Sequence, residues 1–141
     1  MLPSMVACIG LDSEPILHEL EILDNDFEVI EINSSKYPEG KVIKIIDNPE
    51  TMDLIITTLR HYTHGWQYYI DHTPSAPISI RFKDDEEIRF MIQIGYTYKT
   101  SSGNPIYYLS YGFGNRGRPL KESEFKEIMS ALEIDDFLAL H

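Results

Sequence analysis

Three stretches of alternating apolar and polar residues, joined by short turns, most constrain what this chain can fold into. They cover residues 78–83, 88–98 and 106–111, with a charged turn at 84–87 and a Ser/Gly/Asn/Pro turn at 101–105. Alternation with a period of two is typical of strands that bury one face. The pattern therefore predicts an antiparallel meander with one dry and one wet face.

Helical and strand signals also mark the rest of the chain. Asp47-Asn-Pro-Glu50 sets a capping residue ahead of a proline in a first helical turn, with Glu three residues after Asp47. Apolar spacing of three and four residues marks the helical stretches, and β-branched runs mark the strands. The expected helices cover residues 13–23, 49–61 and 120–133, and the expected further strands cover 27–33, 41–46 and 66–71, the first two of these pairing as a hairpin.

This order of elements predicts the α+β class. We expect a mostly antiparallel sheet of about five to six strands, with two or three helices packed on one face. At 141 residues, 43% of them hydrophobic, the chain has the size and the material for one core. We expect a single domain over residues 1–141, in which residues 1–11 form a tail.

Negative charge is concentrated in the first third of the chain. Eight carboxylates and no Lys or Arg lie between Asp12 and Glu31, and residues 1–54 hold 12 acidic and 3 basic side chains. A one-sided field governs partner choice and association rate rather than fold. It opposes nucleic acid and anionic membranes and leaves basic proteins and cations open; a basic protein is the partner that we expect first. The residues expected to hold it are Glu19, Glu21, Asp24 and Asp26.

Aromatic residues gather on the expected strands, and two explanations fit them. They are Trp66, Tyr68, Tyr69, Tyr96, Tyr98, Tyr107, Tyr108 and Tyr111. Cross-strand pairs that stabilise the sheet are the favoured explanation. The alternative is a binding surface on the open face of the sheet, since Tyr and Trp are enriched at interfaces; Tyr96 and Tyr98 are then the candidate partner-binding residues.

The segment from Gly112 to Gly117 matches G-x-G-x-x-G, the dinucleotide fingerprint. That fingerprint needs a helix after the third glycine and a returning parallel strand, for which the remaining 24 residues leave no room. We expect a tight strand-to-helix loop in which the glycines adopt positive φ. Arg116 and Arg118 beside the following helix are candidates for holding a carboxylate or phosphate.

Three histidines, His61, His64 and His72, fall within twelve positions. The first two have helical ligand spacing, so a zinc or nickel site is an alternative to half-exposed residues around a helix end. No serine elbow or Cys–His pair indicates nucleophilic catalysis. We therefore expect no catalytic residue and no cofactor.

Cys8 is the lone cysteine, and no apolar run is long enough to span a membrane. An apolar and a small residue before it are similar to the end of a bacterial lipoprotein signal, but the basic leader is missing. We expect a buried thiol in a cytoplasmic protein. Lipidation at Cys8, with membrane anchoring after removal of an upstream signal, is the alternative.

The order of strand, Asn48-Pro-Glu50 helix, Trp66 and alternating strands, closing with Tyr107-Tyr-Leu-Ser-Tyr and a helix, resembles small uncharacterised bacterial proteins. Several of them are predicted lipoproteins. The resemblance covers residues 27–134 and implies a bacterial origin. The leading hypothesis is a non-catalytic binding module, of the immunity or inhibitor kind, that holds a basic protein. A domain tethered through Cys8 and a metal-dependent enzyme using the histidines are the alternatives.

Overall fold

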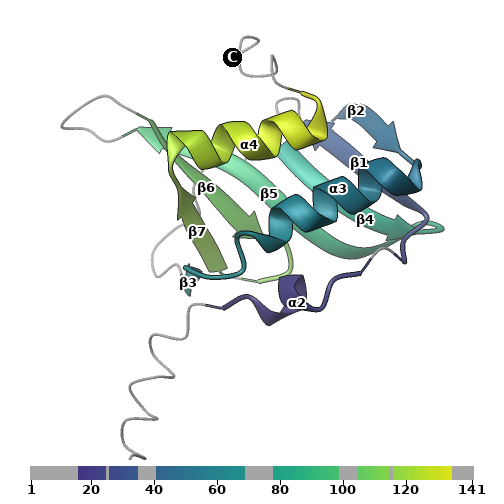
Figure 1. Cartoon of the computed structure of the whole chain (residues 1–141), viewed down its shortest axis with the longest axis horizontal. Helices are drawn as coiled ribbons and strands as arrows, with labels where there is room; N and C mark the ends of the chain where they lie inside the picture. Colours follow the sequence, from purple (N-terminus) through teal and green to yellow (C-terminus); the bar gives the residue numbers. More distant parts are fainter. Residues whose placement is uncertain are drawn as a thin grey trace, which may run out of the picture.

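A seven-stranded antiparallel sheet with helices on one face organises the chain in the computed structural model (Figure 1). The structure describes residues 16–24, 26–34, 41–68, 78–98, 105–114 and 116–134, without the side chains of residues 96–98 and 105. The strands are β1 (Val29–Ser34), β2 (Lys41–Ile46), β3 (Gln67–Tyr68), β4 (Ile78–Asp84), β5 (Glu87–Tyr98), β6 (Pro105–Tyr111) and β7 (Arg116–Leu120). The described helices are α2 (His18–Glu21), α3 (Pro49–Arg60) and α4 (Glu122–Leu132). The predicted α+β class is confirmed.

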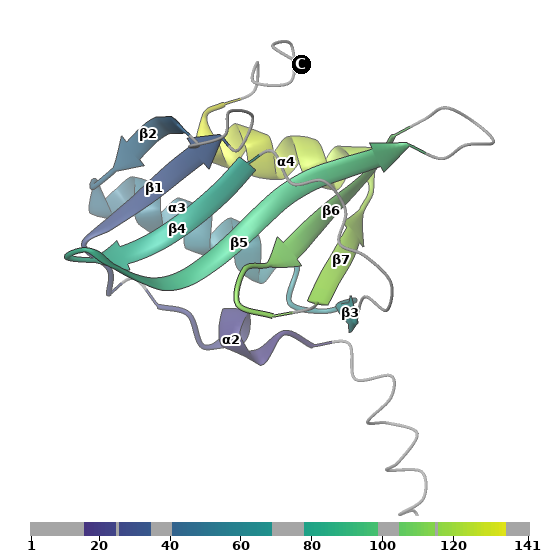
Figure 2. The same ribbon diagram turned by 180° about the vertical axis from the view of Figure 1, so that it is seen from behind.

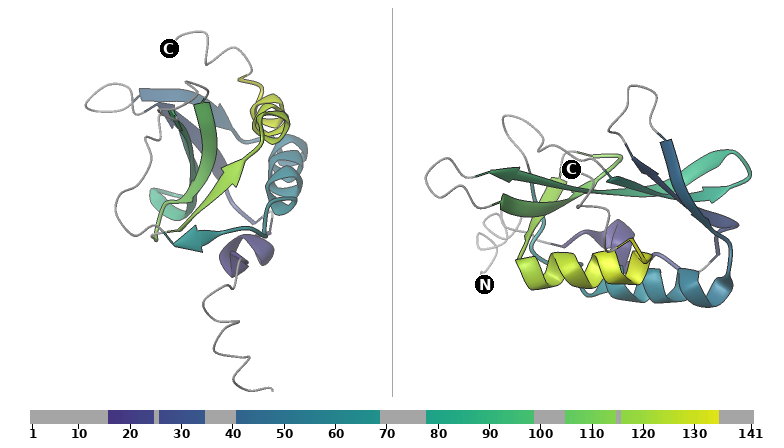
Figure 3. Two further views of the ribbon diagram at one scale, coloured as in Figure 1. Left: turned by 90° about the vertical axis from the view of Figure 1, so that its left-hand side faces the viewer. Right: turned by 90° about the horizontal axis from the view of Figure 1, so that it is seen from above.

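The helices and the sheet form two layers. Both α3 and α4 lie across the same face of the sheet, as the views from the side and from above show (Figure 3). No described helix covers the opposite face (Figure 2). The short α2 lies at one end of the two layers (Figure 1), and its Leu20 is buried in the core.

The strand order is β2-β1-β4-β5-β6-β7-β3, so the first hairpin joins the meander through β1 and β4. Ile32 of β1 lies opposite Ile80 of β4, which lies opposite Ile92 of β5, and all three are fully buried. This row faces α3 and α4 because it belongs to the apolar set of the alternation. The predicted β1–β2 hairpin and the β4–β5–β6 meander are confirmed.

The expected count of five to six strands is too low, because it does not include β7. The Gly112–Gly117 segment turns from β6 into β7, which pairs antiparallel with β6, rather than leading directly into a helix. Gly112 and Gly114 do not adopt positive φ; Gly65 is the described glycine that does, at +89°. A Cβ on Gly112 would lie 2.5–2.7 Å from the side chain of Met91, so close packing is what requires glycine there.

Helix α3 begins as the sequence predicts, but with a different cap. The side chain of Asn48, not that of Asp47, accepts hydrogen bonds from the backbone N–H groups of Glu50 and Thr51, at 2.8 and 3.1 Å. Pro49 then occupies the first helical position, where no N–H is needed. The apolar face of α3, which includes Met52 and Ile55, is buried against the sheet.

Helix α2 is a single turn, much shorter than the helix expected over residues 13–23, of which residues 13–15 lie outside the described part. Its neighbours explain where it ends. Leu17, Leu20 and Leu23 are all buried, and the N–H of Leu17 donates to the carbonyl of Thr63 at 2.9 Å. These three leucines, spread over seven positions, fill one end of the core. Their packing, rather than helix propensity, determines the conformation of the segment.

Strand β3 contains two residues, whereas a strand over 66–71 was expected; residues 69–71 lie outside the described part. Trp66 precedes β3 and is buried, with its indole N–H donating to the carbonyl of Tyr62 at 2.6 Å. Among the described residues, no helix is long and apolar enough to cross a membrane.

Candidate functional site

Five carboxylates of the first third, Glu19, Glu21, Asp24, Asp26 and Glu28, lie on a described segment that crosses one end of the sheet. We call residues 16–24 and 26–28 the acidic segment. Glu28 is structural: its backbone N–H donates to Asp84, and its carboxylate accepts from the N–H of Asp85, both at 3.0 Å. Glu21 lies 3.3 Å from the ring of His18. Within the described part of the chain, Glu19, Asp24 and Asp26 make no hydrogen bond or ion pair.

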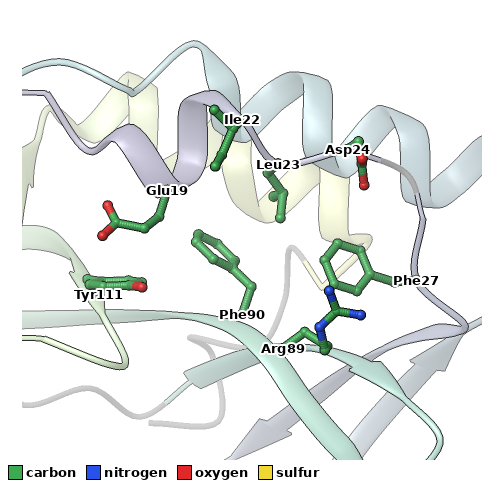
Figure 4. Close-up of a pocket in the computed structure, with 8 residues that line it drawn as sticks. All are labelled: Glu19, Ile22, Leu23, Asp24, Phe27, Arg89, Phe90 and Tyr111. Carbon is green, nitrogen blue, oxygen red and sulfur yellow. The ribbon is translucent and has the colours of Figure 1, made fainter.

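A pocket of about 280 Å³ lies between the acidic segment, the start of β5 and the end of β6 (Figure 4). The acidic segment supplies one wall, and β5 and β6 supply the other. Two of the four candidate carboxylates from the sequence take part in it. The lining residues are Glu19, Ile22, Leu23, Asp24, Phe27, Arg89, Phe90 and Tyr111.

The floor of the pocket is aromatic and anchored in the core. The rings of Phe90 and Tyr111 lie 5.7 Å apart, and Phe90 also packs edge-on against Phe82 at 5.5 Å. Phe82 and Phe90 are buried, so the inner part of this floor is fixed by the core. At the outer end, Tyr111 meets Phe113, which is 51% exposed. The floor therefore leads from the core to an exposed ring.

Charge is distributed unevenly around this floor. The guanidinium of Arg89 lies over the ring of Phe27, 5.9 Å from its centroid, and is paired with Asp84. In Figure 4 the carboxylate of Glu19 lies above the Tyr111 ring, whereas Asp24 lies at the Phe27 end. Burial and then the charge of Glu19 raise the pKa of the Tyr111 hydroxyl, although Arg116 opposes them. Among the lining residues Arg89 is paired with Asp84, so Glu19 and Asp24 carry the unbalanced charge of the lining, which Arg116 outside the lining offsets in part at the Tyr111 end.

Known protein families, curated proteins and solved structures offer no match to this chain. The pocket and the contacts around it therefore carry the functional conclusion.

The two candidate anion-binding arginines hold separate parts of the fold together. Arg116 donates from Nη2 to the carbonyl of Ile16 at 2.6 Å and lies over the Tyr68 ring, 5.3 Å from its centroid. Its Nε is buried without a partner among the described residues. Arg116 thus anchors the start of the acidic segment to β7.

Arg118 makes the corresponding link at the end of α3. Its Nε donates to the carbonyl of His64 at 2.6 Å, its Nη1 lies 3.3 Å from Glu124, and its guanidinium stacks on Tyr62. The Glu124 carboxylate also accepts from the N–H of Lys121 at the start of α4. Burial raises the pKa of Glu124, but these hydrogen bonds and the Arg118 charge outweigh it, so that the pKa is lowered.

His61 and His64 lie around the end of α3 and are exposed. His61 lies 3.8 Å from Glu127, and His64 is within 3.1 Å of the Thr63 hydroxyl. His72 lies outside the described residues. In the described ranges no group of three or more His, Cys, Asp and Glu side chains is placed to hold a metal ion.

The aromatic residues from the sequence divide among several environments. Tyr107 stacks on Phe125 of α4, with centroids 4.0 Å apart, so it faces the helices rather than the open face. Tyr68 is exposed beside Arg116. The backbones of Tyr96 and Tyr98 lie opposite Tyr107 and Pro105, and their side chains lie outside the described part. Tyr69 and Cys8 lie outside it as well.

A polar cluster occupies the sheet face away from the helices. Glu31 accepts from Asn33 at 3.1 Å and from Lys83 at 3.3 Å, and the Glu31 and Lys83 side chains are each 16% exposed. Burial raises the pKa of Glu31, but the two hydrogen bonds and the charges of Lys83 and Arg81 outweigh it, so that the pKa is lowered. This cluster satisfies its own charges and belongs to the framework of the sheet.

Sequence reasoning identified Glu19 and Asp24 but missed Phe27, Arg89 and Phe90 as pocket residues. In the sequence, Phe27 and Phe90 look like any other apolar residue of a strand. Arg89 looks like any other charged strand residue that faces solvent. What makes them a site is the pairing of β1 with β4 and of β4 with β5, which places residues distant in sequence around one opening.

Proposed function

We propose that this protein is a non-catalytic binding module that uses the acidic segment to hold a basic protein. Its size and charge suit an immunity or inhibitor protein, for which opposite fields speed encounter and suppress wrong partners. The observation that carries the proposal is the placement of Glu19 and Asp24, without internal partners among the described residues, at an aromatic-lined pocket.

Apolar groups next to these charges support a protein partner. Ile22 on the acidic segment is 76% exposed, and Phe113 beside Tyr111 is 51% exposed. Protein interfaces combine apolar and aromatic side chains, which become buried when the partner binds, with a surrounding rim of polar residues. The acidic segment presents both, because its leucines point into the core while Ile22 and the carboxylates do not. The cytoplasm, expected from the lone cysteine, is the compartment in which we place the encounter.

The proposal is tested by the rate at which a captured partner associates. The pure protein serves as bait in a lysate of its own organism at ~50 and ~300 mM salt, a range over which surface attraction is progressively screened. Association of the captured protein with the wild type is then compared with that of a variant carrying E19Q, E21Q, D24N and D26N. We expect the variant to associate about tenfold or more slowly than the wild type at ~50 mM salt. At ~300 mM the variant should still be the slower of the two, by a smaller factor, because the attraction is screened. An unchanged association rate at ~50 mM would show that the acidic segment does not guide the partner.

A further inference from the structure

We infer that the pocket beside the acidic segment receives an arginine side chain of the partner. This inference rests on the proposed function and specifies the group that is recognised. It would make Glu19 and Asp24 contact residues of the interface, distinct from Glu21 and Asp26, which lie on the same segment but do not line the pocket.

The aromatic floor of the pocket matches the plane of a guanidinium group. Phe90 and Tyr111 present aromatic rings there, and a planar, weakly hydrated guanidinium stacks on such rings. The same protein shows this packing three times, since Arg89, Arg116 and Arg118 lie 5.9, 5.3 and 4.9 Å from the ring centroids of Phe27, Tyr68 and Tyr62.

The residues that line the pocket leave negative charge unbalanced. Arg89 at one end is neutralised by Asp84, so it does not offset the carboxylates of Glu19 and Asp24. These two carboxylates lie at opposite ends of the opening in Figure 4, above the Tyr111 ring and near Phe27. A cation that enters over the floor meets a carboxylate on either side, and charge-assisted hydrogen bonds to a carboxylate are among the stronger polar contacts.

The size of the pocket also favours a single side chain. Small-molecule sites usually enclose about 300–1,000 Å³. The pocket, at about 280 Å³, falls just below that range and suits one protruding side chain better than a cofactor. A side chain from a protein partner also allows Ile22 and Phe113, which flank the opening, to be covered in the same complex.

The experiment uses N-acetyl-argininamide as the probe, with the neutral isostere N-acetyl-citrullinamide and the ammonium analogue N-acetyl-lysinamide in parallel titrations. Binding is followed by NMR shifts of the Phe90 and Tyr111 ring protons. We expect the arginine probe to shift these resonances saturably, and to bind at least about fivefold more tightly than either of the other two. The reason is that only the guanidinium combines charge with a stacking plane.

Two matched double variants isolate the pocket from the general field. E19Q/D24N removes the two pocket carboxylates, and E21Q/D26N removes the same charge from the same exposed segment. We expect E19Q/D24N to weaken the arginine probe by about tenfold, and E21Q/D26N to weaken it by less than about twofold. The inference is overturned if the citrulline probe binds as tightly as the arginine probe, or if the lysine probe binds as tightly or more tightly. It is also overturned if the two variants weaken the arginine probe equally, or if no saturable shift is seen.

Partner kinetics separate this inference from the proposed function. If both double variants slow association equally and neither changes the dissociation rate, the acidic segment steers a basic partner, but the pocket holds no arginine. If neither variant affects association, the proposed function itself fails. Faster dissociation of the partner from E19Q/D24N alone supports both.

Discussion

Arginine side chains in this structure act as ties between distant segments. Arg116 joins β7 to the backbone at Ile16, and Arg118 joins β7 to the backbone at His64. In both cases the guanidinium also stacks on a tyrosine, so one side chain uses its charge and its plane at once. Replacement of either by lysine would keep the charge but lose the stacked, forked geometry.

Glycine at position 112 is required by the Met91 side chain. A Cβ there would approach Met91 atoms to 2.5–2.7 Å, and the β carbon of Met91 cannot move without its strand. We expect Gly112→Ala to lower the free energy of unfolding by about 1–3 kcal/mol, the usual cost of overpacking. Measured by urea titration, Gly112→Ala should cost roughly 1 kcal/mol or more less in a Met91→Ala background than in the wild type, because the two side chains are coupled. Additive effects of the two substitutions would contradict the contact.

Glu31 makes stability depend on pH in a defined direction. Its folded-state pKa is lowered, so its ionised form contributes stability above the unfolded value near 4.5, and this contribution is lost as the pH falls through the folded-state pKa. We expect Glu31→Gln to cost about 1–2 kcal/mol at pH 7, because Lys83 loses its partner. The difference from wild type should shrink below about pH 4.5. The exposed Glu86→Gln serves as the control, and a cost of Glu31→Gln that stays constant from pH 7 to pH 3 would rule out this account.

At the level of the elements, the cap of α3 offers a direct test. Asn48 accepts two backbone N–H groups of the first turn, whereas Asp47 precedes the cap. We expect Asn48→Ala to cost about 1 kcal/mol, the usual value for a lost cap. Asp47→Ala should change stability by less than about 0.5 kcal/mol, as exposed substitutions do. Thermal and urea unfolding followed by the fluorescence of Trp66, the single tryptophan, measure both. A larger loss for Asp47→Ala would assign the cap to that residue instead.

The elements that the sequence predicted well are those with a strong period and many partners. Helix α3 and strands β2, β4, β5 and β6 lie within a residue or two of their predicted bounds. Strand β7 was missed because Arg-Gly-Arg-Pro-Leu has no alternation and contains a proline. The pairing explains how Pro119 is tolerated: β3 opposes β7 only at Arg116 and Gly117, so Pro119 faces no strand on that side.

The candidate site was predictable only in part, for a physical reason. The run of carboxylates is visible in the chain itself and led to Glu19 and Asp24. The pocket exists because the acidic segment packs its leucines into the core beside β5 and β6, and this is a tertiary event. Helix propensity favoured a longer helix over residues 13–23, and burial of Leu17, Leu20 and Leu23 produced a single turn instead.

For the molecule as a whole, charge opposes stability. The net charge is −11, and most of it lies in the first third of the chain. Repulsion among like charges destabilises a compact state and is screened by salt. We expect an increase from ~50 to ~300 mM NaCl to raise stability by roughly 1 kcal/mol, a Tm shift of about 3 °C.

The variant with Glu19, Glu21, Asp24 and Asp26 neutralised provides the comparison for this salt effect. It should be more stable than the wild type at ~50 mM and should gain less from added salt, as measured by thermal unfolding. A lower Tm for this variant at low salt would mean that these carboxylates stabilise the fold. It would contradict the view that they are unpaired groups available to a partner.

The strand order also determines when during synthesis the pocket beside the acidic segment can form. β1 finds its second neighbour in β4, and the acidic segment is fastened by Arg116 of β7 and completed by Tyr111 of β6. Pairings between residues so distant in the chain form late, because a long loop must close first. The acidic segment leaves the ribosome early, but its pocket lacks a second wall until the chain has been made through Tyr111, and the segment gains its anchor only after Arg116. A nascent chain therefore carries the negative charge of the acidic segment well before it can form the pocket beside that segment.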